Sequence, residues 1–165
     1  MQSAKDTFYV TLRDRLAALN PARTIVVRGV TRPGSLVEEN ELAAAYQPVD
    51  TFSLRWLGLR VDSKAGLPLV VMNCEVRYGT DGSAGNGGMD RGRLLAGMDA
   101  ELTAAVNSAP QNVVKTSYAT GGAGTAMGTR VFWGDVTFAA AVVEDERLTR
   151  VATVEVFAYQ EAGEL

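Results

Sequence analysis

Residues 67–107, LPLVVMNCEVRYGTDGSAGNGGMDRGRLLAGMDAELTAAVN, contain the pattern around which the rest of the chain can be arranged. In the first part, 67–78, apolar side chains alternate with polar ones, and the polar positions are Asn73, Glu75 and Arg77. A period of two is typical of a strand with one buried face. These residues therefore predict a strand that is covered on one side only.

The second part of this stretch predicts a helix that could provide the cover. Residues 79–88 are rich in glycine, and in 89–107 the apolar residues recur at three- and four-residue steps. That spacing places them along one side of an α-helix. The recurring residues are Leu94, Leu95, Met98, Leu102, Ala105 and Val106. A helix packed on a sheet is the expected organising contact.

Outward toward the N-terminus, residues 3–20 predict a first helix with one apolar side, and 24–28 predict a short β-branched strand. Ser3 and Asp6 resemble a capping pair at the start of the helix. The strand is followed by residues 30–50, which show no clear period. Because long irregular loops in compact domains are usually functional or disordered, we expect a flexible arm or partner-binding loop with at most a helical turn or two.

Two hairpins complete the prediction. Residues 51–61 change phase at Trp56, which indicates a bulge or a strand buried on both faces, and a turn at 62–66 joins them to the strand at 67–78. Near the C-terminus, 129–143 and 148–159 are separated by a polar turn at 144–147. Both faces of the last strand are apolar, so we expect it to be central or to form an intersubunit contact.

The remaining segments are a strand at 113–118 and a second glycine-rich loop at 119–128. A chain of 165 residues suits one domain, here 1–165, with one core. The predicted fold class is α+β, a two-layer domain in which two helices pack on one face of a mostly antiparallel sheet.

Composition restricts the chemistry. The chain has no histidine, which removes the commonest general base at neutral pH and the commonest zinc ligand. Its formal charge of −3 argues against general nucleic-acid binding, and its apolar runs are too short to span a membrane. No secretory signal is visible. The single cysteine, Cys74, is expected to be a core thiol, with a reactive thiol as the alternative.

Two glycine-rich segments have the look of ligand-binding loops. The loop at 79–88 precedes a helix, as phosphate-binding loops do, but it lacks a Gly-Lys-Ser/Thr ending, so anion binding near Arg91 and Arg93 competes with a plain flexible loop. In 121–128, Met127 stands where a dinucleotide fingerprint needs its third glycine, which favours a connector.

Charged and aromatic residues leave further alternatives. Glu75 could form an acid site with Asp90 or Asp99, although exposed strand charges need no such role. Asp90 is better explained as a helix N-cap. The two tryptophans, Trp56 and Trp133, are either core residues or interface anchors.

The order of these elements resembles the tail terminator family of long-tailed bacteriophages and prophages, also called tail-completion or minor tail proteins. The features that carry the resemblance are the first helix at 6–19 and the strand at 24–28, then the arm, the hairpin ending in 74–78, the helix at 89–107 and the closing hairpin ending in 154–157. The resemblance covers nearly the whole chain in order and length, without a diagnostic motif.

This resemblance implies a structural virion protein and no enzyme. It implies a homo-oligomeric ring, commonly a hexamer, that ends the tail tube and joins it to the head–tail connector, with no cofactor, membrane or specific nucleic acid. The ring would form in the host cytoplasm and remain in the virion tail. Ring closure needs two different patches on each subunit. We expect them on the arm and the two hairpin tips, at Arg32, Glu38, Glu39, Glu41, Lys64, Asp145 and Arg147.

Two alternatives remain open. The chain could be another tail tube or neck subunit, which would share the same plain pattern. It could also be a small-molecule or anion-binding α+β domain in which Arg77, Arg91 and Arg93 hold an anion between sheet and helices.

Overall fold

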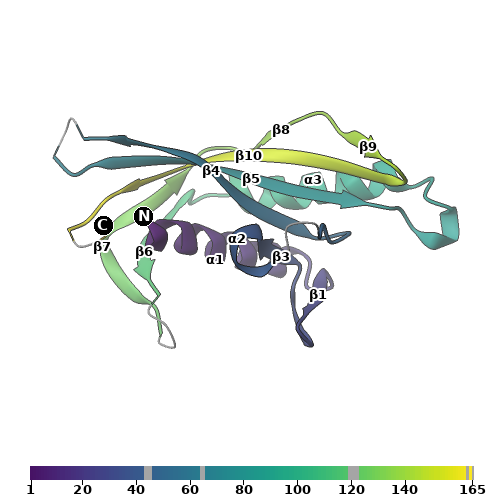
Figure 1. Ribbon diagram of the computed structural model, residues 1–165, viewed down its shortest axis with the longest axis horizontal. Helices are drawn as coiled ribbons and strands as arrows, with labels where there is room; N and C mark the ends of the chain where they lie inside the picture. The colour runs from purple at the N-terminus through teal and green to yellow at the C-terminus, as the bar shows by residue number, and fades with distance from the viewer. Residues whose placement is uncertain (43–45, 64–65, 119–122, 163, 165) are drawn as a thin grey trace.

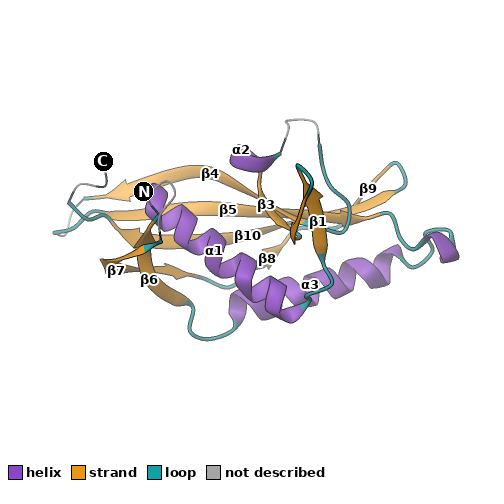
Figure 2. Ribbon diagram, turned by 90° about the horizontal axis from the view of Figure 1, so that it is seen from below, coloured by secondary structure: helices purple, strands orange, loops and turns teal. Residues whose placement is uncertain are grey.

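The computed structural model describes residues 1–42, 46–63, 66–118, 123–162 and 164. A long, twisted sheet forms one layer, and the helices α1 (Gln2–Leu19) and α3 (Arg91–Asn107) lie together on one of its faces (Figures 1 and 2). The predicted α+β class and the two-helix layer are therefore confirmed. No helix in the described part of the chain is both long and apolar enough to cross a membrane.

The main sheet has the strand order β3-β4-β5-β10-β7-β6, and two short strands, β8 and β9, also pair with β10. Among the strand pairs of the described residues, only β3–β4 is parallel and the others are antiparallel. The strands are β3 (Ser35–Val37), β4 (Phe52–Asp62), β5 (Leu69–Thr80), β6 (Asn112–Ser117), β7 (Thr125–Trp133), β8 (Thr137–Phe138), β9 (Val142–Glu144) and β10 (Arg147–Tyr159).

The core lies between the helices and the inner face of this sheet. Cys74 on β5 is opposite Val154 on β10, and both are fully buried beneath the helices. Phe8 of α1 packs edge-on against Trp56 and Trp133, with ring centroids 5.9 Å and 5.5 Å away. Each such fully buried apolar side chain contributes about 1.5–3 kcal/mol of transfer free energy. This layer is the main source of the fold's stability.

The central strands match the sequence prediction well. β4 and β5 form the predicted antiparallel hairpin, and its register shifts between Trp56 and Leu59, as the change of phase indicated. β10 lies between β5 and β7, so its two apolar faces belong to a central strand. Cys74 is the expected core thiol, and burial raises its pKa far above the ordinary range. Both tryptophans are buried, and the Trp133 indole donates to the Val106 carbonyl over 2.9 Å.

The expectation of an irregular arm at 30–50 is wrong for its first part. A two-stranded sheet joins β1 (Thr24–Val27) to β2 (Val30–Pro33), and β3 and the single helical turn α2 (Glu38–Glu41) follow. Arg28 and Gly29 both have positive φ, 51° and 79°. A two-residue turn with positive φ at both positions matches the twist of a hairpin. The sequence reading missed it because arginine is rare in such a turn.

The predicted capping pair is also wrong. Ser3 lies inside α1, whose N-cap is Met1 without a side-chain cap, and Asp6 accepts a hydrogen bond from Gln2 over 2.7 Å. The N-terminal amine instead lies 3.6 Å from a Glu164 carboxylate oxygen. This long-range ion pair holds the first residues against the C-terminal segment, which a local capping rule does not anticipate.

Both glycine-rich segments contain more structure than predicted. β5 extends through Gly79 and Thr80, and a 3-10 turn, η1 (Ala84–Asn86), follows. In the second segment, 119–122 lie outside the described residues, whereas 125–128 belong to β7. The strand predicted at 129–143 is interrupted after Trp133, where the Gly134 amide donates to the Glu155 carbonyl over 3.0 Å. β8 and β9 then continue along β10 as separate short strands.

Candidate functional site

One end of the molecule is formed by the glycine-rich loop before α3 and the turn between β9 and β10 (Figure 1). Arg147 donates to both carboxylate oxygens of Asp81, at 2.7 Å and 3.3 Å, and to the Gln47 carbonyl at 2.9 Å. The hydrogen bond between them lowers the pKa of Asp81 and raises the pKa of Arg147. Arg147 therefore ties the β9–β10 turn to two other loops.

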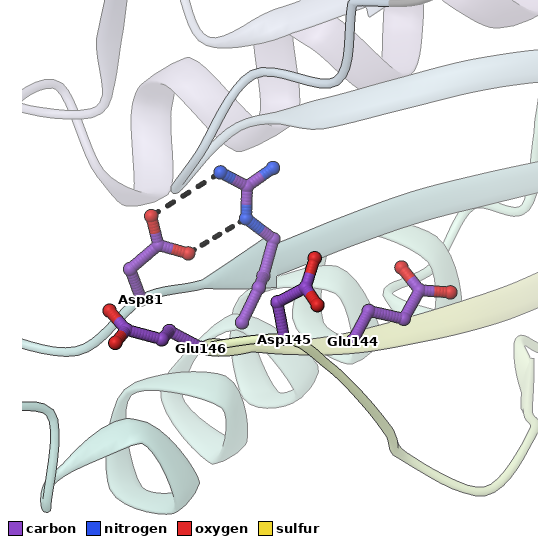
Figure 3. A pocket seen from close by; sticks show the side chains of 5 residues that line it. Asp81, Glu144, Asp145 and Glu146 are labelled. Carbon is purple, nitrogen blue, oxygen red and sulfur yellow. Dashed lines mark hydrogen bonds and ion pairs between the residues drawn. The ribbon is translucent and has the colours of Figure 1, made fainter.

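The acidic side chains at this turn have no comparable partners. Figure 3 shows Asp81, Glu144, Asp145 and Glu146 around an open depression of about 370 Å³. Among the described residues, the carboxylates of Glu144, Asp145 and Glu146 make no hydrogen bond or ion pair. Asp145 has a positive φ of 55° and is exposed. We call residues 142–146 the acidic tip.

The glycine-rich loop holds itself together. Asp90 accepts bonds from the Ser83 hydroxyl at 2.7 Å and the Ser83 amide at 2.9 Å, which lower its pKa to about 2. Asp90 is at the N-cap position of α3, but its side chain makes no capping bond and turns back into the loop. Gly82 has a φ of +82°, and a Cβ there would lie 2.6 Å from the Gly88 Cα. The loop therefore has a defined conformation that requires glycine at position 82.

The three arginines of the anion-binding alternative have separate surroundings. Arg91 donates to the carbonyls of Gly88 and Glu146. Arg77 pairs with Glu75 on the outer face of β5 at 3.2 Å, whereas Arg93 is exposed on α3. The expected grip between sheet and helices is therefore not formed, because Arg77 belongs to the face of the sheet that the helices do not cover.

The expected carboxylate site is likewise dispersed. Glu75 pairs with Arg55 over 2.9 Å on the outer face. Asp99 accepts a bond from the Tyr78 hydroxyl over 2.6 Å and pairs with Arg150 over 3.2 Å on the helix side. Burial and the bond to Asp99 raise the pKa of Tyr78 above its ordinary range. Within the described ranges, no three acidic, histidine or cysteine residues gather as a metal site would require.

A second surface lies between the β1–β2 hairpin and α2, on the helix side of the sheet (Figure 2). It is an open groove of about 450 Å³, which we call the arm groove. Its lining residues are Val27, Arg28, Val30, Arg32, Asn40 and Glu41. Two valines and two arginines line the groove, and the charge of one arginine, Arg32, is neutralised by Glu41.

Glu41 is the residue that holds the arm groove together. It accepts hydrogen bonds from the Val37 amide at 3.0 Å and the Tyr9 hydroxyl at 3.3 Å, and it pairs with Arg32. Burial and the neighbouring Glu41 charge raise the pKa of Tyr9. Arg28, at the hairpin turn, is exposed and makes no hydrogen bond or ion pair with any described residue. The groove therefore has a free positive charge at one end.

A third surface is the edge of β4. Beyond its short pairing with β3, β4 pairs only with β5 in the described part of the chain. Leu57, Leu59 and Val61 on this stretch are 39%, 47% and 43% exposed. An exposed, apolar edge presents unpaired backbone groups to another chain. We call residues 57–61 the open edge.

Side chains protect parts of two other strand edges, on β6 and β7. Thr7 on α1 accepts from the Thr116 amide of β6 over 2.9 Å, and its hydroxyl donates to the Ser3 carbonyl of its own helix at 2.6 Å, with the Thr116 carbonyl farther away at 3.1 Å. On β7, the Glu161 carboxylate accepts from the Gly128 and Thr129 amides at 3.2 Å and 2.8 Å. Because these contacts satisfy edge groups that would otherwise be free, the open edge on β4 is a distinct feature.

The structure places the residues of the predicted interface in two groups. Arg32 and Glu41 lie together in the arm groove, and Asp145 and Arg147 lie together at the β9–β10 turn. Glu39 pairs with Lys5 over 3.7 Å, next to Glu38 on α2. Lys64 lies outside the described residues. The turn of the β4–β5 hairpin and the acidic tip are at opposite ends of the sheet (Figure 1).

Sequence reasoning missed Arg28 and the open edge. The Arg28-Gly29 pair between two β-branched runs was the available signal for the hairpin, but it is weaker than Asn-Gly or Asp-Gly. The open edge has no sequence signal, because strand order decides which strand lacks a neighbour.

Comparison with known proteins adds no relative. No protein-family model matches the chain, and no curated protein is significantly similar to it.

Proposed function

We propose that this chain is a structural subunit of a phage or prophage tail, a tail terminator that forms a homo-oligomeric ring, ends the tail tube and joins it to the head connector. The observation that carries the proposal is the open edge of β4, where three apolar side chains accompany backbone groups that no described strand pairs. Such an edge is completed when another chain adds to it.

Two further features support an assembly role. The β1–β2 hairpin projects from the body (Figure 1), and two-stranded hairpins are only marginally stable alone. The arm groove and the acidic tip are different surfaces, as the heterologous contacts of a ring require. The element order that resembles the tail terminators agrees with this role.

The test is the oligomeric state and its dependence on the open edge. We expect the purified protein to form rings in a concentration-dependent manner, measured by sedimentation velocity and negative-stain microscopy. Leu59→Lys should weaken self-association by about tenfold or more, because charge on an edge opposes strand addition. Its stability should change by only about 0.5 kcal/mol, since Leu59 is a surface residue.

The matched control is Leu19→Lys at the end of α1, where the leucine is exposed to a similar degree. This variant should assemble like the parent chain. A parent protein that stays monomeric at high concentration would overturn the proposal.

A tail tube or neck subunit is the second candidate, because an open strand edge would serve it equally well. The two differ in closure. A terminator ring stops growing and binds the end of a tail tube, whereas a tube subunit continues to stack into filaments. Microscopy of the assembled protein, alone and with tail tubes, separates them.

A further inference from the structure

We propose that the acidic tip of one subunit, residues 142–146, occupies the arm groove of the next copy. This inference rests on the proposed function, because it names the contact that would link neighbouring subunits in the ring. It follows from the charge and shape of two surfaces that belong to the same chain.

The arm groove offers apolar surface with positive charge. Val27 and Val30 face each other across the hairpin turn, and both line the groove. Arg32 is neutralised by Glu41, so the free charge is that of Arg28. An extended segment with apolar side chains followed by an acid would satisfy both features.

The acidic tip has the complementary composition. Val142 and Val143 of β9 are 52% and 66% exposed, and three acids follow them. Among the described residues, the carboxylates of Glu144, Asp145 and Glu146 make no hydrogen bond or ion pair, and Glu144 interacts with Arg147 through its charge alone. Successive side chains of a strand point to opposite faces, so one of the two valines, with the acids that follow it, matches the valines and the unpaired arginine of the groove. Complementary charges of this kind select and orient partners.

The contact is directional. The acidic tip is on β9 and β10, whereas the arm groove is formed by the β1–β2 hairpin and α2. A contact between two different patches leaves one of each unused, so it propagates into a ring when the rotation between neighbours closes and into a filament when it does not. It also supplies the marginal hairpin with a packing partner that the monomer lacks.

Charge reversal tests the contact. Arg28→Glu reverses the free charge of the groove, and Glu144→Lys with Glu146→Lys reverses the charge of the tip while keeping Asp145 at its positive φ. Each change alone should weaken self-association by about tenfold or more, because like charges then meet. Arg93→Glu, an exposed reversal on α3, is the matched control and should have little effect.

Rescue makes the test specific. All three substitutions in one chain should restore assembly to within about threefold of the parent, since opposite charges face each other again. An equimolar mixture of the groove variant and the tip variant should assemble as well. Circular dichroism and thermal unfolding of each variant verify that it is folded.

The outcomes separate this inference from the proposed function. If the parent assembles and the reversed variants assemble equally well, or if the triple variant is not rescued, the contact is wrong while the ring proposal stands. If the parent does not assemble at all, the proposed function fails and the contact fails with it. If the parent forms symmetric dimers that the charge reversals weaken, the ring proposal is wrong, but the contact between tip and groove is supported.

Discussion

Glu161 is a single residue that holds several parts of the chain together. Its carboxylate accepts bonds from the Thr129 hydroxyl at 2.6 Å and from the amides of Gly128 and Thr129, and it lies 3.5 Å from the Lys115 ammonium. The Thr129 hydroxyl, the two amides and Lys115 favour the charged form and lower the pKa of Glu161 to about 2. Glu161 thus binds the backbone amides of β7 in a stretch that does not pair with β10.

Glu161→Gln should therefore destabilise the protein in a pH-dependent way. The folded pKa of about 2 is below the ordinary value of 4.5, so the stabilisation is fully present above about pH 4.5 and is lost as pH falls toward 2. Urea unfolding of both proteins from pH 2 to 7 measures the difference in free energy. The difference should shrink at acid pH; a constant difference would contradict the assignment. Glu155→Gln, exposed on β10, is the control.

Lys115 is a second residue whose role the sequence did not indicate. It is fully buried, and its ammonium donates to Glu164 and to the Tyr159 carbonyl, each at 2.6 Å. In a strand pattern, a lysine is ordinarily placed on the solvent face. Here the C-terminal segment supplies the acids that make burial tolerable, and a charge pointing inward from an edge strand also opposes strand addition.

At the scale of elements, the contact between α1 and β6 closes one edge of the sheet. Thr7 is buried on α1, and its hydroxyl accepts a hydrogen bond from the Thr116 amide. This contact explains how a helix can protect a strand edge without adding a strand.

Thr7→Val should cost about 1–3 kcal/mol, because the shape is kept while the partly buried Thr116 amide loses its acceptor. Equilibrium urea unfolding measures the loss, and faster hydrogen exchange at Thr116 locates it. Thr11→Val is the control, since that hydroxyl bonds only to the Thr7 carbonyl within the helix at 2.8 Å. If the two substitutions lower the free energy of unfolding equally, the contact with the strand edge contributes no more than a hydrogen bond within the helix.

Prediction from sequence succeeded for elements with strong periodicity. The long helices, both strands of the first hairpin and the last strand, β10, were found within a few residues, because their apolar patterns follow 3.6 or two residues over many positions, whereas the strand predicted at 129–143 is three separate strands. It failed for β2, β3 and α2, which are three or four residues long. Segments of that length have no period to detect, and their pairing partners are distant in sequence.

At the scale of the whole molecule, the candidate contact surfaces lie on elements that project from the body. The acidic tip and the turn of the β4–β5 hairpin lie at opposite ends of the sheet, and the β1–β2 hairpin projects on the helix side (Figures 1 and 2). In contrast to these projections, the core side chains between the sheet and the helices are buried within the subunit. Assembly would therefore order the projections and leave the core unchanged.

Hydrogen exchange can test this division. In dilute protein, the amides of 24–32 should exchange rapidly, because the hairpin has few tertiary contacts, and they should become protected at concentrations where rings form. Amides of β5, which is paired on both sides, should be protected in both states. If the hairpin exchanges equally fast in the assembled protein, it is not part of the subunit contact.

The sequence by itself determined the fold class and the long elements, and it narrowed β10 to a central strand or an intersubunit contact, because burial of an apolar face imposes a local period that can be read residue by residue. Only the tertiary structure decided which strand edge stays open, that Lys115 is buried, and that the side chains of Arg28 and of the acids at the tip make no hydrogen bond or ion pair with described residues. These properties depend on strand order and on contacts between residues far apart in the chain. No local pattern contains that information.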